Sequence, residues 1–115
     1  MTRHDDAARL RHMLDYAQEA VGMAHGRQPQ DLERDRMLQL ALVRLVEIVG
    51  EAAARVSPDA QQRFPSIPWQ QAQGMRNRLV HGYDKVDLAV LWDTIQDDLP
   101  ALIVQLREAM GQGSQ

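Results

Sequence analysis

The 115-residue sequence contains no cysteine, and aromatic residues make up only 4% of it. The absence of cysteine excludes disulfide bonds, thiolate metal ligands and a cysteine nucleophile, and it fits a reducing cytosol. Because aromatic residues are scarce and no strand pattern is present, the chain has no aromatic-studded sheet that could stack on nucleobases. Nothing visible in the sequence would therefore read a nucleic-acid sequence base by base.

Long apolar runs are also missing. No run approaches the ~20 apolar residues that are needed to cross a bilayer. The first residues after the initiator methionine read T-R-H-D-D, which is not the basic-then-apolar order of a secretion signal. We therefore expect a soluble cytoplasmic protein without a membrane segment.

The chain has no excess of positive charge, since its net charge is −3. This balance argues against a protein that coats nucleic acid through a generally basic surface. Between residues 69 and 86 the charged residues are Arg76, Arg78, Lys85 and Asp84, which gives this segment a net charge of +2. The rest of the chain then has a net charge of −3 minus +2, or −5. Any binding of nucleic acid should be local, with Arg78 and Lys85 as candidate contacts.

A chain of this length forms one domain with one hydrophobic core and needs no metal or disulfide to fold. We predict a single domain over residues 1–110 and a flexible tail over residues 111–115. Apolar residues recur at spacings of three and four in four segments, and no strand pattern or internal repeat is present. The prediction is an all-α fold, specifically an antiparallel four-helix bundle.

Glycine and proline residues separate the predicted helices. The helices are expected over residues 5–25, from 31 or 35 to 56, from 68 to a cap at Gly82, and over 87–110. Residues 27–30 read as a connection between the first two helices. A short extra helical turn is expected between the second and third helices, where Ser57 can cap it and Pro58 can open it. Pro100 removes one backbone hydrogen bond from the last helix and is expected to kink it.

The second predicted helix is apolar around most of its circumference but carries one polar stripe. At about 100° per residue, four residues fall within about 60° of one another: Arg44, Glu47, Glu51 and Arg55. One interpretation is a solvent-exposed face with a Glu51–Arg55 ion pair worth a few tenths of a kcal/mol. The other is that Glu47 or Glu51 faces the third helix or a partner subunit and orients an arginine. Close approach of another helix would explain Gly50, which costs roughly 1 kcal/mol relative to alanine.

The most informative segment is R-N-R-L-V-H-G-Y at residues 76–83. Arg76 stays charged and offers a planar fork of donors that fits phosphate oxygens. An unperturbed imidazole titrates near pH 6.5, so His81 can act as an acid or a base at neutral pH. On one straight helix the two side chains would point about 140° apart, which aims them poorly at one phosphate. Asn77, four residues before His81, would share its face and could fix the ring tautomer.

Structural interpretations of the same residues remain open at this point. His81 could complete a helix C-terminus, where an imidazolium interacts favourably with the helix dipole. Tyr83 could simply pack beside Trp92. The other three histidines have no partners at metal-ligand spacing, so no metal and no cofactor is expected.

Several segments together point to one family. The R-x-x-x-x-H-x-Y pattern of residues 76–83 is accompanied, in order, by LVEIVGEAA at 45–53, IPW at 67–69, GMRNRLVHGY at 74–83 and LWDTIQDDLP at 91–100. On these residues the chain resembles the HepT-type ribonuclease toxins of the HEPN-domain superfamily, which are paired with small nucleotidyltransferase antitoxins. Asp84 stands where many members have an aromatic residue.

The resemblance implies a fold, an activity and a partner. It implies a homodimer in which Arg76 and His81 of both chains form one composite site that cleaves RNA without metal. Supporting roles then fall to Asn77, Glu47 and Glu51, and RNA binding to Arg78 and Lys85. The resemblance also implies that an antitoxin transfers AMP from ATP to Tyr83, which would block the RNA cleft by bulk and negative charge.

Two other functions remain as alternatives. The chain could be a noncatalytic subunit that binds nucleotide or substrate for a partner nucleotidyltransferase, with the same arginines on a triphosphate. The intact Arg76 and His81 favour the nuclease, because a pure binding module does not need a histidine that titrates near neutrality. A dimerisation adaptor is supported only by the apolar second helix.

Overall fold

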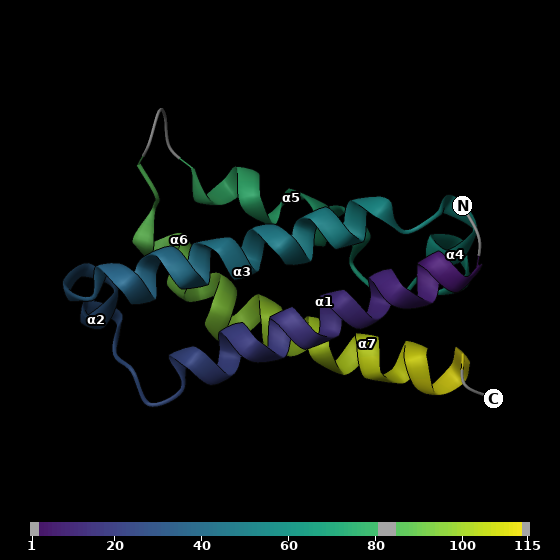
Figure 1. Cartoon of the computed structure of the whole chain (residues 1–115), viewed down its shortest axis with the longest axis horizontal. Helices are drawn as coiled ribbons and strands as arrows, with labels where there is room; N and C mark the ends of the chain where they lie inside the picture. Colours follow the sequence, from purple (N-terminus) through teal and green to yellow (C-terminus); the bar gives the residue numbers. More distant parts are fainter. Residues whose placement is uncertain (1–2, 81–84, 114–115) are drawn as a thin grey trace.

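The computed structural model of the chain describes residues 3–80 and 85–113 (Figure 1). Within these residues every secondary-structure element is helical apart from one isolated β-bridge. This confirms the all-α prediction. In chain order the elements are α1 (Arg3–Ala24), α2 (Pro29–Arg34), α3 (Arg36–Arg55), α4 (Pro58–Arg63), α5 (Trp69–Leu79), α6 (Leu88–Asp93), the π-helical segment η1 (Thr94–Asp98) and α7 (Leu99–Gly113). None of the helices in the described ranges is long and apolar enough to cross a membrane.

The long helices pack side by side in an antiparallel bundle. Figure 1 shows α1 between α3 and α7, and α3 between α1 and α5, with each neighbour running in the opposite direction. Apolar side chains of all these helices are buried between them, among them Met13, Leu42, Val46, Met75, Leu79, Leu102 and Leu106. Burial of this apolar surface is the main favourable contribution to folding.

The connection predicted after the first helix is partly helical, which corrects that prediction. Pro29 occupies the first turn of α2, where its missing N–H costs nothing. The backbone N–H of Gln28 donates to the carboxylate of Asp31 at 2.7 Å. The carboxylate of Asp35 then accepts the N–H of Leu38 at 3.0 Å and caps α3. The second long helix therefore begins directly after Asp35, one of the two starts predicted.

Two glycines allow backbone arrangements that a side chain would disfavour, and Gly50 has the role that its position predicted. Gly26 follows α1 with a φ of 80°, a left-handed conformation in which glycine has no steric penalty. Gly50 of α3 faces the backbone of α5, because a Cβ atom built at this position would lie 3.2 Å from the carbonyl oxygen of Ala72 and 3.5 Å from that of Gln73. The absence of a side chain at position 50 therefore lets α3 and α5 approach closely.

The last helix is disturbed ahead of Pro100, as predicted, and the disturbance takes the form of a π segment. The side chain of Asp87 caps α6 by accepting the N–H of Val90 at 3.1 Å. In η1 the backbone widens, and the N–H of Leu99 bonds to the carbonyl of Thr94, five residues back. Widening offers room for the proline ring, which in a regular α-helix clashes with the carbonyl four residues earlier. Helix α7 then continues through Gly113, into the tail predicted at residues 111–115.

A buried carboxylate ties the start of α1 to the junction of α3 and α4. Asp6 is buried and accepts two hydrogen bonds from Ser57, one from its N–H at 2.8 Å and one from its hydroxyl at 2.6 Å. The hydroxyl oxygen of Ser57 in turn accepts the N–H of Ala60 at 3.2 Å and caps α4. The predicted helical turn with Ser57 as its cap is confirmed, and Asp6 is a partner that its position in the sequence did not reveal.

Replacing Asp6 should destabilise the fold in a pH-dependent way. We expect Asp6→Ala to lower the free energy of unfolding by about 1–3 kcal/mol at pH 7, because it leaves the partly buried donors of Ser57 unpaired. Burial raises the pKa of Asp6, but the hydrogen bonds from Ser57 and the charge of Arg63 together lower it by more. The pKa therefore lies below its ordinary value of 3.8. Such a carboxyl group stabilises the fold above its unfolded-state pKa, and this stabilisation is lost as the pH falls through the folded-state pKa.

Urea unfolding of both proteins at neutral and acidic pH measures this effect. The difference between wild type and Asp6→Ala should shrink on acidification through the range below about pH 4. Asp15→Ala is the matched control, since Asp15 lies on the same helix in an exposed pair with Arg11. A cost for Asp6→Ala no larger than that for the control would contradict this account.

Candidate active site

The motif begins in the last turns of α5 and continues beyond the helix. Helix α5 ends at Leu79, and Val80 is extended, with φ −98° and ψ 119°. Val80 forms an isolated antiparallel bridge with Val86, and the N–H of Asp87 donates to the carbonyl of Leu79 at 2.7 Å. The prediction that this helix continues to a cap at Gly82 is therefore wrong. The backbone pairing instead holds together the two ends of the segment that contains His81.

Two predicted site residues, His81 and Tyr83, lie outside the described residues. The angle of about 140° between Arg76 and His81 assumed a straight helix through both residues. Because α5 ends at Leu79, that angle does not apply, and neither does the face that Asn77 was expected to share with His81.

Arg76 reaches back from α5 to α3. Its Nε lies 3.2 Å from Oε2 of Glu47, in an ion pair whose side chains are 60% and 21% exposed, respectively. The contact depends on the close packing at Gly50, because the antiparallel register that sets Gly50 against Ala72 also sets Glu47 opposite Arg76. Since Glu47 engages Nε and most of the side chain is exposed, terminal N–H groups of Arg76 remain available to an external anion.

The polar stripe of α3 forms a line of alternating charge. The carboxylate of Glu47 also lies 3.6 Å from Nη1 of Arg44, and the same nitrogen lies 3.3 Å from Oε1 of Glu51. The ion pair of Glu51 is thus with Arg44 and not with the predicted Arg55. Of the two glutamates proposed to orient an arginine of the third helix, the structure places Glu47 against that helix and Glu51 against Arg44.

The remaining candidates do not gather around Arg76. Nη2 of Arg78 lies 3.5 Å from Oδ2 of Asp98 in η1, so consecutive arginines of the motif contact different helices. Asn77 is exposed and lines, with Arg78, a shallow hollow on α5 whose other walls are Gln70, Gln71 and Gly74. Lys85 is exposed directly before the bridge at Val86. Sequence reasoning missed the contact with Asp98, since no local spacing connects it to Arg78.

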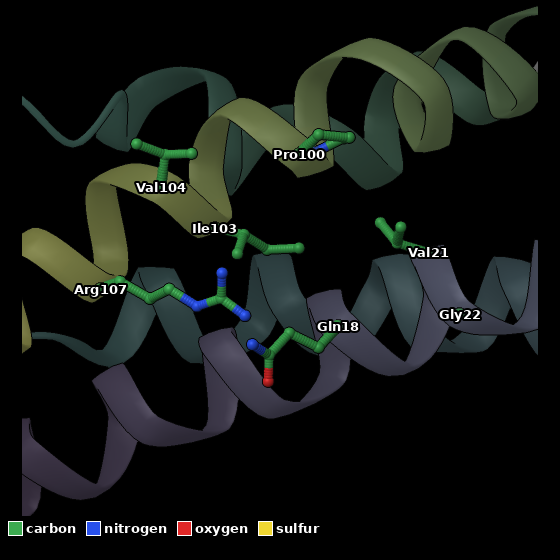
Figure 2. Close-up of a pocket in the computed structure, with 7 residues that line it drawn as sticks. All are labelled: Gln18, Val21, Gly22, Pro100, Ile103, Val104 and Arg107. Atoms are coloured by element: carbon green, nitrogen blue, oxygen red, sulfur yellow. The ribbon is translucent and has the colours of Figure 1, made fainter. Parts of the chain in front are cut away.

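A second groove lies on another side of the bundle, between α1 and α7 (Figure 2). Figure 2 shows the side chains of Gln18 and Arg107 reaching toward each other from these two helices, beside apolar residues that line the groove: Val21, Pro100, Ile103 and Val104. The lining offers one cation and no group that titrates near neutral pH, so this groove is not a candidate for acid–base chemistry. Within residues 3–80 and 85–113 no three acidic or histidine side chains gather as metal ligands would.

Comparison with known proteins identifies the class of this helical bundle. The family model described as Ribonuclease HepT-like matches residues 13–109, which is most of the chain and includes every candidate site residue. The chain therefore belongs to the HepT-like ribonuclease family, as the motif at residues 76–83 indicated.

Curated relatives agree with this assignment. A probable ribonuclease HepT of Thermococcus cleftensis is 40% identical over 73 residues, which cover 64% of this chain and 66% of that protein. A putative RNase of Caldanaerobacter subterraneus subsp. tengcongensis is 31% identical over 101 residues, 88% of this chain and 90% of the relative. A putative RNase of Methanocaldococcus jannaschii is 29% identical over 102 residues, 89% of this chain and 94% of the relative. No solved structure matches the chain.

The Glu47–Arg76 pair should contribute little to folding stability. We expect Glu47→Gln to change the free energy of unfolding by only about 0.2–1 kcal/mol, because solvent and salt screen an ion pair this exposed. Chemical denaturation of both proteins measures the change, and Asp15→Asn, which breaks the exposed Arg11–Asp15 pair, is the control. A loss several times that of the control would show that Glu47 is needed for folding, not only for the position of Arg76.

Proposed function

We propose that this protein is a toxin that cleaves RNA without a metal ion, with Arg76 and His81 as its catalytic residues. The observation that carries the proposal is the guanidinium of Arg76, exposed and held by Glu47 at the end of α5, five positions before His81 in a chain of a ribonuclease family. Arginine and histidine are side chains of the two kinds that phosphodiester cleavage uses, one for charge stabilisation and the other for proton transfer.

The reaction needs proton transfer at two oxygens and stabilisation of charge at phosphorus. The 2′-hydroxyl loses its proton and attacks phosphorus, the bond from phosphorus to the 5′ oxygen breaks, and that oxygen gains a proton. The imidazole of His81 is suited to either proton transfer near neutral pH. Arg76 donates to the nonbridging oxygens as their charge grows. Glu47 touches Arg76 through Nε, so it is a positioning residue.

A homodimer would complete the site. Large apolar side chains are exposed near the motif, namely Met37 (82%) and Leu40 (52%) at the start of α3 and Val80 (40%) after α5. At about 100° per residue, Leu40 lies within about 20° of Glu47 around the axis of α3, so it shares a face with the Arg76 contact. Covering this surface with a second copy would be favourable by about 25 cal/mol per Å² of apolar area. A two-fold axis there would bring both copies of Arg76 and His81 to one cleft.

The other polar residues of the motif would bind the RNA strand beside the cleft. Lys85 is exposed and can contact a phosphate directly. Arg78 shares its charge with Asp98, so its contact should be weaker. Asn77 offers amide donors and an acceptor on the exposed face of α5. The net charge of +2 over residues 69–86 gives this region a local attraction for RNA in a protein whose net charge is −3.

The proposed regulation acts through Tyr83. A separate nucleotidyltransferase antitoxin would transfer AMP from ATP to its hydroxyl, forming a phosphodiester and releasing pyrophosphate. The added group carries negative charge and bulk two residues from His81, and like-charge repulsion would oppose RNA binding. This part of the proposal rests on the motif and on the family, because Tyr83 lies outside the described residues.

Cleavage of labelled total RNA in EDTA tests the nuclease directly. We expect wild type, purified without a partner, to cut RNA. His81→Ala should be slower by about 10²- to 10⁴-fold, the usual contribution of a general acid or base. Arg76→Ala should be slower by about 10²- to 10³-fold, since it removes a donor to the developing charge. Glu47→Gln should fall between wild type and Arg76→Ala.

The matched control is Arg11→Ala, which removes the same charge from an exposed position on α1 and should cut at the wild-type rate. Equal cleavage by wild type and His81→Ala would disprove the assigned mechanism. Absence of cleavage by wild type, once mass spectrometry shows Tyr83 unmodified, would instead favour a noncatalytic subunit that binds nucleotide for a partner enzyme.

Modification of Tyr83 should abolish cleavage. Coexpression with a nucleotidyltransferase antitoxin of the kind proposed should add the mass of one or more AMP groups to wild type and none to Tyr83→Phe. Intact-protein mass spectrometry measures the addition. Tyr83→Phe should keep its nuclease activity in the presence of the partner and ATP. AMP found on the Phe variant would place the acceptor elsewhere.

A further inference from the structure

A small polar cavity between α1 and α3 gathers cations that the proposed mechanism does not use. Its volume is about 150 Å³, and its walls are Arg9 and His12 of α1 with Ile48, Glu51, Ala52 and Arg55 of α3. The one carboxylate among these residues, that of Glu51, is already paired with Arg44 outside the cavity wall. The lining therefore has an excess of positive charge in a protein that is negative overall.

One side chain that lines the cavity carries an unpaired donor. Nε of Arg9 is buried and has no hydrogen-bond partner among the described residues, so the charge of this guanidinium is poorly compensated. The terminal N–H groups of the same guanidinium can donate to an oxyanion bound in the cavity. The volume is several times the ~30 Å³ that one water occupies in the liquid, so a phosphate group fits. His12 is held beside Tyr16, with ring centroids 6.3 Å apart in an edge-to-face arrangement.

One wall of the cavity is formed by α3, the helix whose Glu47 pairs with Arg76. Glu51 lines the cavity and contacts Arg44, which contacts Glu47, which holds Arg76. Eight residues separate Glu47 from Arg55, which corresponds to about 12 Å along α3 at 1.5 Å per residue. A strand whose cleaved phosphate lies at Arg76 could thus place another phosphate, beyond the adjacent one, at Arg9 and Arg55. Guanidinium groups suit this contact because they bind phosphate through two parallel hydrogen bonds.

We propose that Arg9, His12 and Arg55 form a phosphate-binding subsite that holds the backbone of the RNA strand at a distance from the cleaved bond. This inference rests on the proposed nuclease function. The subsite contacts phosphate and no base, so it strengthens the binding of longer RNA without adding sequence preference.

The test measures the binding of a fluorescent single-stranded RNA with methylated 2′-hydroxyls, which cannot be cleaved, over a series of KCl concentrations. For Arg55→Gln we expect the slope of log K against log salt to fall in magnitude by about 0.7, the value for one phosphate contact of a single strand. Near 0.1 M salt this corresponds to about fivefold weaker binding. Arg11→Gln, an equal charge change at an exposed site on α1, should keep the wild-type slope.

Arg55 is exposed, so its variant should fold. Arg9→Gln, checked by thermal unfolding, provides a second reading of the same subsite and should give the same reduction. The subsite would be disproved if wild type binds and cleaves RNA but Arg55→Gln and Arg9→Gln show the same salt slope as Arg11→Gln. The proposed nuclease function would then still stand. Wild type that neither binds nor cleaves RNA would overturn the nuclease itself, and the subsite with it.

The same phosphate chemistry could serve a free anion or a nucleotide, and a second arm separates these sources. Inorganic phosphate and ATP are titrated calorimetrically into wild type and Arg55→Gln. If either ligand binds wild type and binding is lost in the variant, while the salt dependence of RNA binding is unchanged, the cavity takes a free ligand and the proposal is wrong. We expect inorganic phosphate and ATP to compete with RNA only at concentrations far above that of the RNA.

Discussion

The close approach of α3 and α5 at Gly50 determines where the described motif residues lie. A side chain at position 50 would meet the backbone carbonyls of Ala72 and Gln73, and carbonyls of a packed helix cannot move aside as a flexible side chain can. The same contact defines the register of the two helices and so sets Glu47 opposite Arg76. A glycine that weakens its own helix by roughly 1 kcal/mol is therefore explained by the close packing of α3 and α5, which places Arg76 against Glu47.

The site combines a rigid support with groups left open to solvent. The buried faces of α3 and α5 hold the backbone, whereas Arg76 is mostly exposed and held on one edge by a single carboxylate. An exposed pair of this kind contributes little to stability, so its physical effect is to orient a cation. The row of charges along α3 continues from this pair to the cavity at Arg9 and Arg55. One helix thus connects the proposed site of cleavage to a place where the rest of a strand could bind.

Local patterns predicted most of the helices, because spacing and capping act over a few residues. The cap at Ser57 and the beginning of the last helix at residue 87 were found in this way. The end of α5 was not found, because it depends on pairing between Val80 and Val86, which are not neighbours in the sequence. Nor could spacing reveal that Asp6 binds a residue 51 positions away, or choose between Glu47 and Glu51 as the neighbour of Arg76. These contacts depend on how the helices pack.

Mixing two inactive variants tests most directly whether two chains share one catalytic site, as we propose. Arg76→Ala and His81→Ala are unfolded together, refolded as a mixture and assayed on RNA in EDTA. If Arg76 of one chain acts with His81 of the other, mixed dimers retain one intact combination, and random assortment restores about a quarter of wild-type activity. Activity no higher than that of the separate variants, with refolded wild type fully active, would contradict the shared site.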